Sequence, residues 1–254
     1  MNVFHARESE AGPVQRQHGA LPPGQRAVAG FPRFGTHLHH APPPIPDRPV
    51  IAFGGDVQEP FEISVAELET LARREVEADF HCVAGWSATG LRWEGVPFAT
   101  VYRTVIEPRL KPDAVIIHVG FVGLDGYRFV TVLDDVLADD VLVADRLNGR
   151  PLEADHGAPV RLVSPQQYGF VSIKHLCGID VYERRPVEKN PAAIRVGRLT
   201  LRTPLIEPHP RARVWREERH PRLPVWLLRG PYRLLIRPIA HLSGRGARRA
   251  NNRS

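Results

Sequence analysis

The segment Ala114–Val122, with the sequence AVIIHVGFV, is an apolar run that only His118 interrupts. Further apolar runs follow at 128–133 and 141–147, and the second of these ends at Asn148-Gly149. Short apolar runs between turn residues are typical of strands, and Asn-Gly favours a tight hairpin because both residues accept positive φ. With two more strand-like runs at 160–163 and 178–183, the sequence predicts a series of mostly antiparallel strands.

The sequence before this series predicts two short helices. The first begins at the capping box Ser64-x-x-Glu67 and places apolar residues out to Val76 on one face. The second begins near Pro97, and apolar residues recur at helical spacing over 98–105. Helices followed by strands, with no repeating βαβ rhythm, predict an α+β fold with mixed, mostly antiparallel sheets and short helices.

Composition excludes several classes of protein. The chain has 254 residues, of which 43% are hydrophobic and 24% are charged, so it can bury a substantial core. Its 21 glycines and 25 prolines disfavour an all-helical fold. Two cysteines, Cys82 and Cys177, cannot form a disulfide framework or a CxxC motif.

Charge divides the chain into an acidic body and a basic tail. Residues 1–183 hold 16 Lys and Arg against 24 Asp and Glu, whereas residues 184–254 hold 18 against 4. We predict an extended N-terminal arm at 1–49, one domain at 50–183 and a basic Arg/Pro-rich extension at 184–254. No nucleic-acid-binding motif accompanies the arginines, so no nucleic-acid partner is expected.

The basic extension is interpreted as a solvated or partner-docking tail. Its arginines alternate with short apolar pieces, which suits an acidic protein or an anionic membrane surface, and packing on the acidic body is the alternative. Pro224, Pro231 and Pro238 recur every seven residues and are expected to exclude one continuous helix. Neither a long apolar span nor a leader peptide is evident, so we expect a cytoplasmic protein that is membrane-peripheral at most.

Cys82 lies in the segment Phe80–Ser87, between the predicted helices. A thiolate beside an imidazole can serve as a nucleophile or a metal ligand, although a solitary cysteine can equally be a small buried hydrophobe. The histidines His37, His39 and His40 also resemble a metal tract, but they have no spaced carboxylate or cysteine and are interpreted as a solvated polar segment.

A second candidate site lies between residues 156 and 174. Arg161 on a strand and Lys174 after a glycine-containing loop, with Ser172 nearby, can converge on a phosphate. The spacing is not that of a Walker loop, and an exposed strand and hairpin is the alternative.

Together these segments resemble the molybdopterin-binding domain of the sulfite oxidase family. The resemblance runs from about residue 28 to 183, and it is nearest to haem-free bacterial members such as the catalytic subunit of the protein-methionine-sulfoxide reductase. The motifs that carry it, in chain order, are Phe31-x-x-Phe34-Gly35-Thr36, Cys82-Val83-x-x-Trp86-Ser87, Trp93-x-Gly95-Val96-Pro97, Asp125-Gly126-Tyr127, Asn148-Gly149-x-Pro151-Leu152, His156-Gly157-x-Pro159-Val160-Arg161 and Tyr168-Gly169-Phe170-x-Ser172-x-Lys174. The resemblance implies a sulfite-oxidase-like molybdopterin-binding fold.

The resemblance also assigns roles to individual residues. Cys82 would be the thiolate ligand of molybdenum, a soft ligand for a metal that also binds the sulfurs of the pterin. Tyr127, with Trp86, would line the substrate side, and Tyr127 is taken as a catalytic residue together with Cys82. The remaining residues expected to contact the cofactor are Arg33, His81, His156, Arg161, Ser172, Ile173 through its backbone, and Lys174.

The expected function follows from this cofactor. The chain would be a molybdenum- and molybdopterin-dependent oxidoreductase that transfers an oxygen atom on a small or protein-bound substrate of the sulfoxide or sulfite type. The sequence has no CxxCH haem-attachment motif, so electrons would be exchanged with a separate partner. The alternative is a non-catalytic binding module with a degenerate cofactor site, whose basic tail docks on an acidic partner or a membrane surface.

Overall fold

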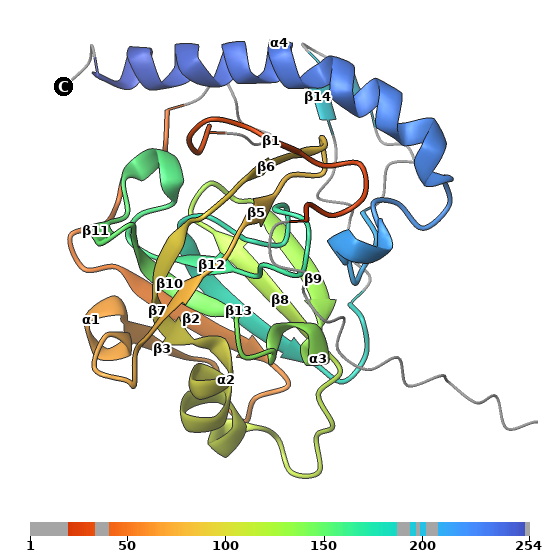
Figure 1. Cartoon of the computed structure of the whole chain (residues 1–254). Helices are drawn as coiled ribbons and strands as arrows, with labels where there is room; N and C mark the ends of the chain where they lie inside the picture. Colours follow the sequence, from red (N-terminus) through yellow and green to blue (C-terminus); the bar gives the residue numbers. More distant parts are fainter. Residues whose placement is uncertain (1–19, 34–40, 187–193, 197–198, 202–207, 252–254) are drawn as a thin grey trace, which may run out of the picture.

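The computed structural model describes residues 20–33, 41–186, 194–196, 199–201 and 208–251. Within these ranges, three β-sheets and several short helices form a body, and one long helix, α4 (Val225–Asn251), lies along one side of it (Figure 1). The arm residues Phe34, Gly35 and Thr36 and the histidines of the 37–40 tract lie outside the described residues. The predicted α+β fold with mostly antiparallel sheets and short helices is confirmed.

The main sheet has the strand order β3-β2-β13-β8-β9. The pair β13–β2 is parallel and the other three pairs are antiparallel. The run at 114–122 forms a strand only from His118, and Val115 and Ile117 lie exposed in the loop before it. The strands are β2 (Val50–Gly55), β3 (Phe61–Ser64), β8 (His118–Gly123), β9 (Arg128–Val132) and β13 (Leu176–Tyr182).

The second sheet is antiparallel, with the order β11-β10-β7-β4 and with β12 also paired to β10. The predicted hairpin at Asn148-Gly149 is confirmed, because these residues have φ of 52° and 77° and join β10 to β11. The strands are β4 (Arg74–Glu77), β7 (Arg92–Pro97), β10 (Leu142–Leu147), β11 (Arg150–Pro151) and β12 (Arg161–Val163).

The predicted helices are present but short. In the capping box, the Ser64 hydroxyl accepts from the Glu67 N–H and the Glu67 carboxylate accepts from the Ser64 N–H. This helix, α1 (Val65–Leu68), ends after one turn, so Val76 lies in β4 and not on the helix as predicted. The second, α2 (Phe98–Val101), continues through a π-helical turn and a 3-10 turn over residues 102–109, and α3 (Leu133–Val136) follows β9.

A third, small sheet ties the N-terminal arm to the body. β1 (Arg26–Ala27) runs parallel to β6 (Trp86–Ala88), which pairs with β5 (Phe80–His81). The remaining described strands, β14 (Ile194–Val196) and β15 (Leu199–Leu201), form a separate hairpin.

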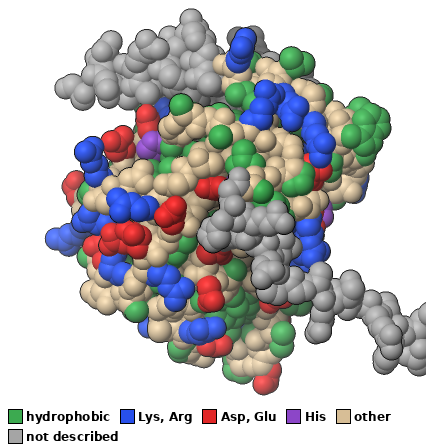
Figure 2. Space-filling view, viewed as in Figure 1, with side chains coloured by type: hydrophobic (Ala, Val, Ile, Leu, Met, Phe, Trp, Pro, Cys, Tyr) green, Lys and Arg blue, Asp and Glu red, His purple; other side chains and the backbone are tan. Residues whose placement is uncertain are grey.

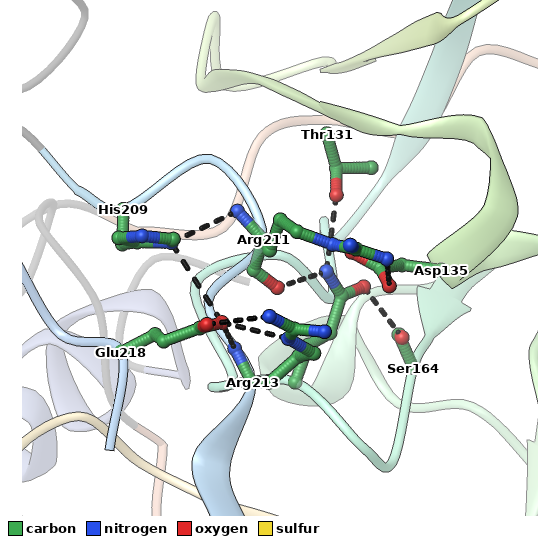
Figure 3. A network of polar contacts seen from close by, with 8 residues as sticks. Thr131, Asp135, Ser164, His209, Arg211, Arg213 and Glu218 are labelled. Carbon is green, nitrogen blue, oxygen red and sulfur yellow. Dashed lines mark hydrogen bonds and ion pairs between the residues drawn. The ribbon is translucent and has the colours of Figure 1, made fainter. Parts of the chain in front are cut away.

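The segment 208–219 packs into the body although it belongs to the predicted extension. Ala212 and Val214 are fully buried. Arg211 makes two hydrogen bonds of 2.9 and 2.7 Å to the Asp135 carboxylate, and the Gln167 side-chain amide donates to the Thr131 hydroxyl at 3.0 Å (Figure 3). The Gln167 amide also donates to the Arg211 carbonyl at 2.5 Å, so this network fixes the segment around Arg211 to the body.

The prediction that the prolines exclude one continuous helix in the tail is wrong, because α4 spans both Pro231 and Pro238. Each proline removes one backbone donor from the helix, at a cost of about 3 kcal/mol. Both prolines are exposed, so water can satisfy the carbonyls that they free. Leucine, arginine and alanine, which favour helix, dominate the rest of the segment.

Candidate functional site

Cys82 sits at the tip of the β5–β6 hairpin. Its N–H donates to the Trp86 carbonyl at 2.9 Å, and its own carbonyl accepts from the Gly85 N–H at 2.9 Å. Gly85 has φ of +95°, a conformation that a side chain would strain, so the tight turn depends on glycine. The Cys82 side chain is buried, with 6% exposure.

The N-terminal arm holds this hairpin in place. The Gln25 side-chain amide donates to the Cys82 carbonyl at 3.1 Å and accepts from the Ser87 hydroxyl at 3.1 Å. The His81 Nδ1 lies 2.8 Å from the same Ser87 hydroxyl. His81, a predicted cofactor contact, therefore directs this ring nitrogen into the arm–hairpin contact.

Burial governs the chemistry of the Cys82 thiol. Loss of solvation raises the pKa of the thiol to about 12, against the smaller opposing effects of a backbone hydrogen bond and of the Arg219 and Lys174 charges. At neutral pH the free thiol is protonated and a poor nucleophile, whereas a bound metal ion would displace the proton. The environment thus disfavours a free nucleophile, and a metal ligand or a buried thiol remains.

Arg161 is the most deeply buried cation of the second segment. Its Nη1 donates to the His156 carbonyl and its Nη2 to the Ser172 carbonyl, both at 2.9 Å. The guanidinium carbon lies 5.3 Å from the ring centroids of both Phe80 and Trp93. Burial lowers the pKa of Arg161 to about 9. The guanidinium therefore binds the backbones of the two loops that carry His156 and Ser172, and its charge has no carboxylate partner among the described residues.

Lys174, Arg33 and His156 gather around Asp155. The Lys174 ammonium donates to the Asp155 carbonyl at 2.7 Å, and the Arg33 Nε lies 3.3 Å from the Asp155 carboxylate. Burial, followed by the charges of Arg161 and Arg33, lowers the pKa of Lys174 to about 7. Burial also lowers the pKa of His156 to about 4, and its ring stacks on Phe31 at a centroid distance of 4.8 Å.

Two loops meet closely to bring Arg161 and Lys174 together. Gly157 has φ of +106°, and a Cβ placed there would lie 3.0 Å from the Lys174 Cα. The neighbouring His175 donates its N–H to the Gly157 carbonyl at 3.1 Å, and its ring Nδ1 lies 2.6 Å from the Ala158 carbonyl. The sequence analysis did not predict that His175 links the two loops, although its position directly after Lys174 places it in this region.

Ser172 and Ile173 were both predicted to contact the cofactor. In the structure, the Ser172 hydroxyl and the Ile173 backbone groups form hydrogen bonds with other parts of the protein. The Ser172 hydroxyl accepts from the Ser164 N–H at 3.1 Å. The Ile173 N–H donates to the Val171 carbonyl at 2.8 Å, and its carbonyl accepts from the Leu162 N–H at 2.9 Å. They shape the loop that carries Lys174, and their contact with a cofactor stays a prediction.

Tyr127 supports the same region from the β8–β9 turn. Its hydroxyl donates to the Phe170 carbonyl at 3.0 Å, and burial raises the pKa of this hydroxyl above its ordinary range. Trp86, the other predicted lining residue, is 1% exposed and packs in the cluster that holds Cys82. The catalytic role of Tyr127 stays a prediction, and the observed contact is one that positions the Phe170 loop.

Arg219 is a charged residue beside the Cys82 hairpin that the sequence analysis did not single out. It is 1% exposed, and its Nη1 donates to the carbonyl of Val83, the residue after Cys82. Its guanidinium carbon lies 5.2 Å from the Tyr168 ring centroid and 5.7 Å from that of Tyr232. The alternating pattern Arg211-Ala212-Arg213-Val214 was the sequence signal that this segment packs on the body.

Taken together, the described residues form a buried thiol and a cluster of cations with few acidic partners. Burial and the charges of Arg161 and Arg33 lower the pKa of Lys174, and the carboxylates of Asp155 and Asp125 oppose them only in part. Buried cations in excess of carboxylates suit a multiply charged anion such as a phosphate ester.

The model of the oxidoreductase molybdopterin-binding domain family matches residues 40–189. The chain belongs to this family. It is thus a molybdopterin-binding oxidoreductase of the sulfite oxidase family, and molybdenum and molybdopterin are the cofactors of that family. This membership favours the enzyme over the non-catalytic binding module.

Named relatives agree with this membership. The uncharacterized oxidoreductase YuiH of Bacillus subtilis (strain 168) is 33% identical over 168 residues, which cover 64% of this chain and 79% of YuiH. The protein-methionine-sulfoxide reductase catalytic subunit MsrP of Xanthomonas axonopodis pv. citri (strain 306) is 30% identical over 151 residues, which cover 54% of this chain and 45% of MsrP. The match therefore spans less than half the length of that relative.

Solved structures include a similar chain. The sulfane dehydrogenase SoxCD from Paracoccus pantotrophus superposes with a TM-score of 0.46 and 21% identity, covering 54% of this chain and 38% of the other.

The described residues fit the family's cofactor. A soft sulfur donor is available at Cys82, and the Arg161–Lys174 cluster supplies the cations that a pterin phosphate requires. Gly157 keeps the space between the two loops free of a side chain.

Proposed function

We propose that this chain is a molybdenum enzyme that transfers an oxygen atom from a sulfoxide, reducing it to the sulfide. The reaction takes up two electrons and two protons and releases water. The observation that carries the proposal is the buried Cys82 thiol together with the cations Arg161 and Lys174, which lie near it and outnumber the carboxylates around them. The MsrP relatives, which are named as protein-methionine-sulfoxide reductases, support the choice of substrate class.

Each group of the site has a proposed task. Cys82 would bind molybdenum through its thiolate, Lys174, Arg33 and His156 would hold the phosphate end of molybdopterin, and Arg161 would add its buried charge while it holds the two loops. Molybdenum bound in this way supplies the two-electron redox chemistry of oxygen-atom transfer. The aromatic rings beside Arg161 and His156 keep water from the anchoring cations, which strengthens their attraction for the phosphate.

The electrons are proposed to come from a separate protein. Among the described residues, no group of three or more His, Cys, Asp or Glu side chains could hold a second metal ion. A redox partner would have to approach the face that carries the Cys82 hairpin, because electron transfer depends on a short distance to the metal.

The test is expression of the chain in a host that makes molybdopterin, followed by metal analysis and two assays. Reduction of methionine sulfoxide, free and within a peptide, is followed with a reduced viologen dye, and oxidation of sulfite is followed with ferricyanide. We expect bound molybdenum and sulfoxide reduction. Oxidation of sulfite without sulfoxide reduction would overturn the proposed reaction, and purification without molybdenum would overturn the proposed site.

A further inference from the structure

Helix α4 has two different faces along residues 225–238. Its inner face carries side chains that are partly buried against the body at helical spacing, namely Val225, Leu228, Arg229, Tyr232 and Ile236. Its outer face carries apolar side chains that are exposed. Because 3.6 residues make one turn, Leu227, Pro231, Leu234 and Pro238 form a single stripe along this outer face.

The inner face is fastened to the candidate site. Tyr232 and Ile236 pack against the hydrophobic cluster that contains Cys82 and Trp86. Arg229 pairs with Glu217, and the Tyr232 hydroxyl hydrogen-bonds to the His220 ring. A Cβ placed on Gly85, in the Cys82 turn, would lie 4.0 Å from the Arg233 Cγ. The helix therefore rests on the Cys82 hairpin, above β1 and β6 (Figure 1).

The outer face exposes large apolar side chains. Trp226 is 74% exposed and Leu234 is 80% exposed, and Leu227 and Leu235 are also exposed. Leu227 and Leu234 lie in the stripe, whereas Trp226 and Leu235 are nine residues apart and lie on its two opposite sides. Because burial of such side chains normally stabilises a protein, their exposure along the outer side of one helix marks an interaction surface.

Basic residues run along one side of this apolar stripe. Arg233 and Arg237 are exposed on the same helix, and Arg222 lies just before it. No Asp or Glu follows Glu218 in the sequence, whereas eight arginines follow Arg219. Figure 2 shows Lys and Arg side chains beside hydrophobic ones at the upper right, where Figure 1 places the first turns of α4.

We propose that the outer face of α4 binds the surface of an anionic lipid bilayer. Tryptophan and leucine would enter the headgroup region, and the arginines would meet the lipid phosphates while their stems cover apolar area. No described helix is long and apolar enough to cross a membrane, so the helix would lie in the plane of the surface. An acidic protein could pair with the arginines, but the exposed Trp226, Leu227 and Leu234 beside them suit the headgroup region of a bilayer better.

The bound orientation has a consequence for the candidate site. Because the inner face of α4 rests on the Cys82 hairpin, docking of the outer face turns that hairpin toward the membrane. This inference concerns the surface alone and does not depend on the proposed reaction.

The experiment is sedimentation of the full chain with vesicles of phosphatidylcholine, with and without phosphatidylglycerol, at low and high salt. We expect binding to the anionic vesicles that weakens with salt and is near zero on neutral vesicles. The double variant Arg233→Gln/Arg237→Gln should weaken binding about fivefold per arginine, equivalent to about 1 kcal/mol each.

A second pair of variants separates the apolar stripe from general surface hydrophobicity. Leu227→Gln/Leu234→Gln should weaken binding about tenfold or more. The matched control, Val115→Gln/Ile117→Gln, removes exposed apolar side chains from the body and should leave binding unchanged.

Three outcomes would overturn the proposal: equal binding to neutral vesicles, equal losses in the two apolar variants, or no vesicle binding at all. If vesicle binding is absent and the chain instead forms a dimer that Leu227→Gln/Leu234→Gln abolishes, the face is an interface between two copies of the chain.

Discussion

Lys174 gives opposite expectations for the stability of the cofactor-free chain and for its affinity for an anion. Replacement by methionine keeps the length of the side chain but removes its charge. We expect Lys174→Met to stabilise the cofactor-free chain at pH 7 and to weaken anion binding. A lysine that served only the fold would lose stability on the same replacement.

The magnitude follows from the surroundings of the ammonium. Burial lowers the pKa of Lys174 from its ordinary value of 10.5 to about 7, and each pKa unit corresponds to about 1.4 kcal/mol. The charged state thus costs the folded chain up to about 5 kcal/mol, which partial exposure reduces. The variant also loses the hydrogen bond to the Asp155 carbonyl, which offsets this gain in stability by about 1.5–3 kcal/mol. The net stabilisation expected at pH 7 is about 2 kcal/mol.

The sign of the pH dependence is also fixed. Because the folded pKa lies below the unfolded one, the cost is fully present below pH 7 and disappears as the pH rises from 7 through 10.5. The stability of the cofactor-free wild type should therefore rise across this window through Lys174. The advantage of Lys174→Met should be largest at pH 7 and small near pH 10.

Urea unfolding of the cofactor-free chain at pH 7 and pH 10 measures these differences, with phosphate titration as the anion assay. Phosphate affinity at pH 7 should fall roughly ten- to hundredfold, from about 1.5–3 kcal/mol per lost charged hydrogen bond. Lys111→Met, at an exposed lysine paired with Asp56, is the control and should change stability by about 1 kcal/mol or less. The reasoning is refuted if Lys174→Met destabilises the chain at pH 7 or leaves phosphate affinity unchanged.

Three further substitutions probe the same site. Gly157→Ala adds a Cβ 3.0 Å from the Lys174 Cα at a positive φ. We expect the free energy of unfolding in urea to fall by about 2 kcal/mol and the molybdenum content to fall with it. The control Gly149→Ala, with open space around the added Cβ, should keep its full metal content. Tyr127→Phe should cost about 1 kcal/mol in urea unfolding by removing the contact to Phe170, and a complete loss of turnover would show instead that the hydroxyl is catalytic. Cys177→Ala should retain molybdenum by metal analysis, and loss of metal would move the ligand assignment to that thiol.

The sequence was sufficient for the local elements whose signals depend on near neighbours. The capping box at Ser64 and Glu67 and the hairpin at Asn148-Gly149 are set by contacts within four residues, and both were predicted. The length of the first helix was not, because pairing of Val76 with β7 outweighs helix propensity.

The site was only partly predictable for a related reason. Cys82, Arg161 and Lys174 could be proposed from their motifs. The motifs do not show that the Arg161 guanidinium donates hydrogen bonds to two backbone carbonyls. Arg219 donates a hydrogen bond to the carbonyl of Val83, which lies 136 residues earlier in the sequence. Patterns in a single sequence carry no information about contacts at such a separation. The continuous helix α4 was missed because a rule about proline in helix interiors was applied to prolines that lie on an exposed face.

The central claim is that the Cys82 sulfur binds molybdenum, and X-ray absorption at the molybdenum edge tests it most directly. The wild type and Cys82→Ser would be loaded in the same host and compared, with Cys177→Ser as the control. The account predicts that Cys82→Ser alone loses one sulfur neighbour of the metal while the pterin content is retained. An unchanged sulfur shell in Cys82→Ser would contradict it.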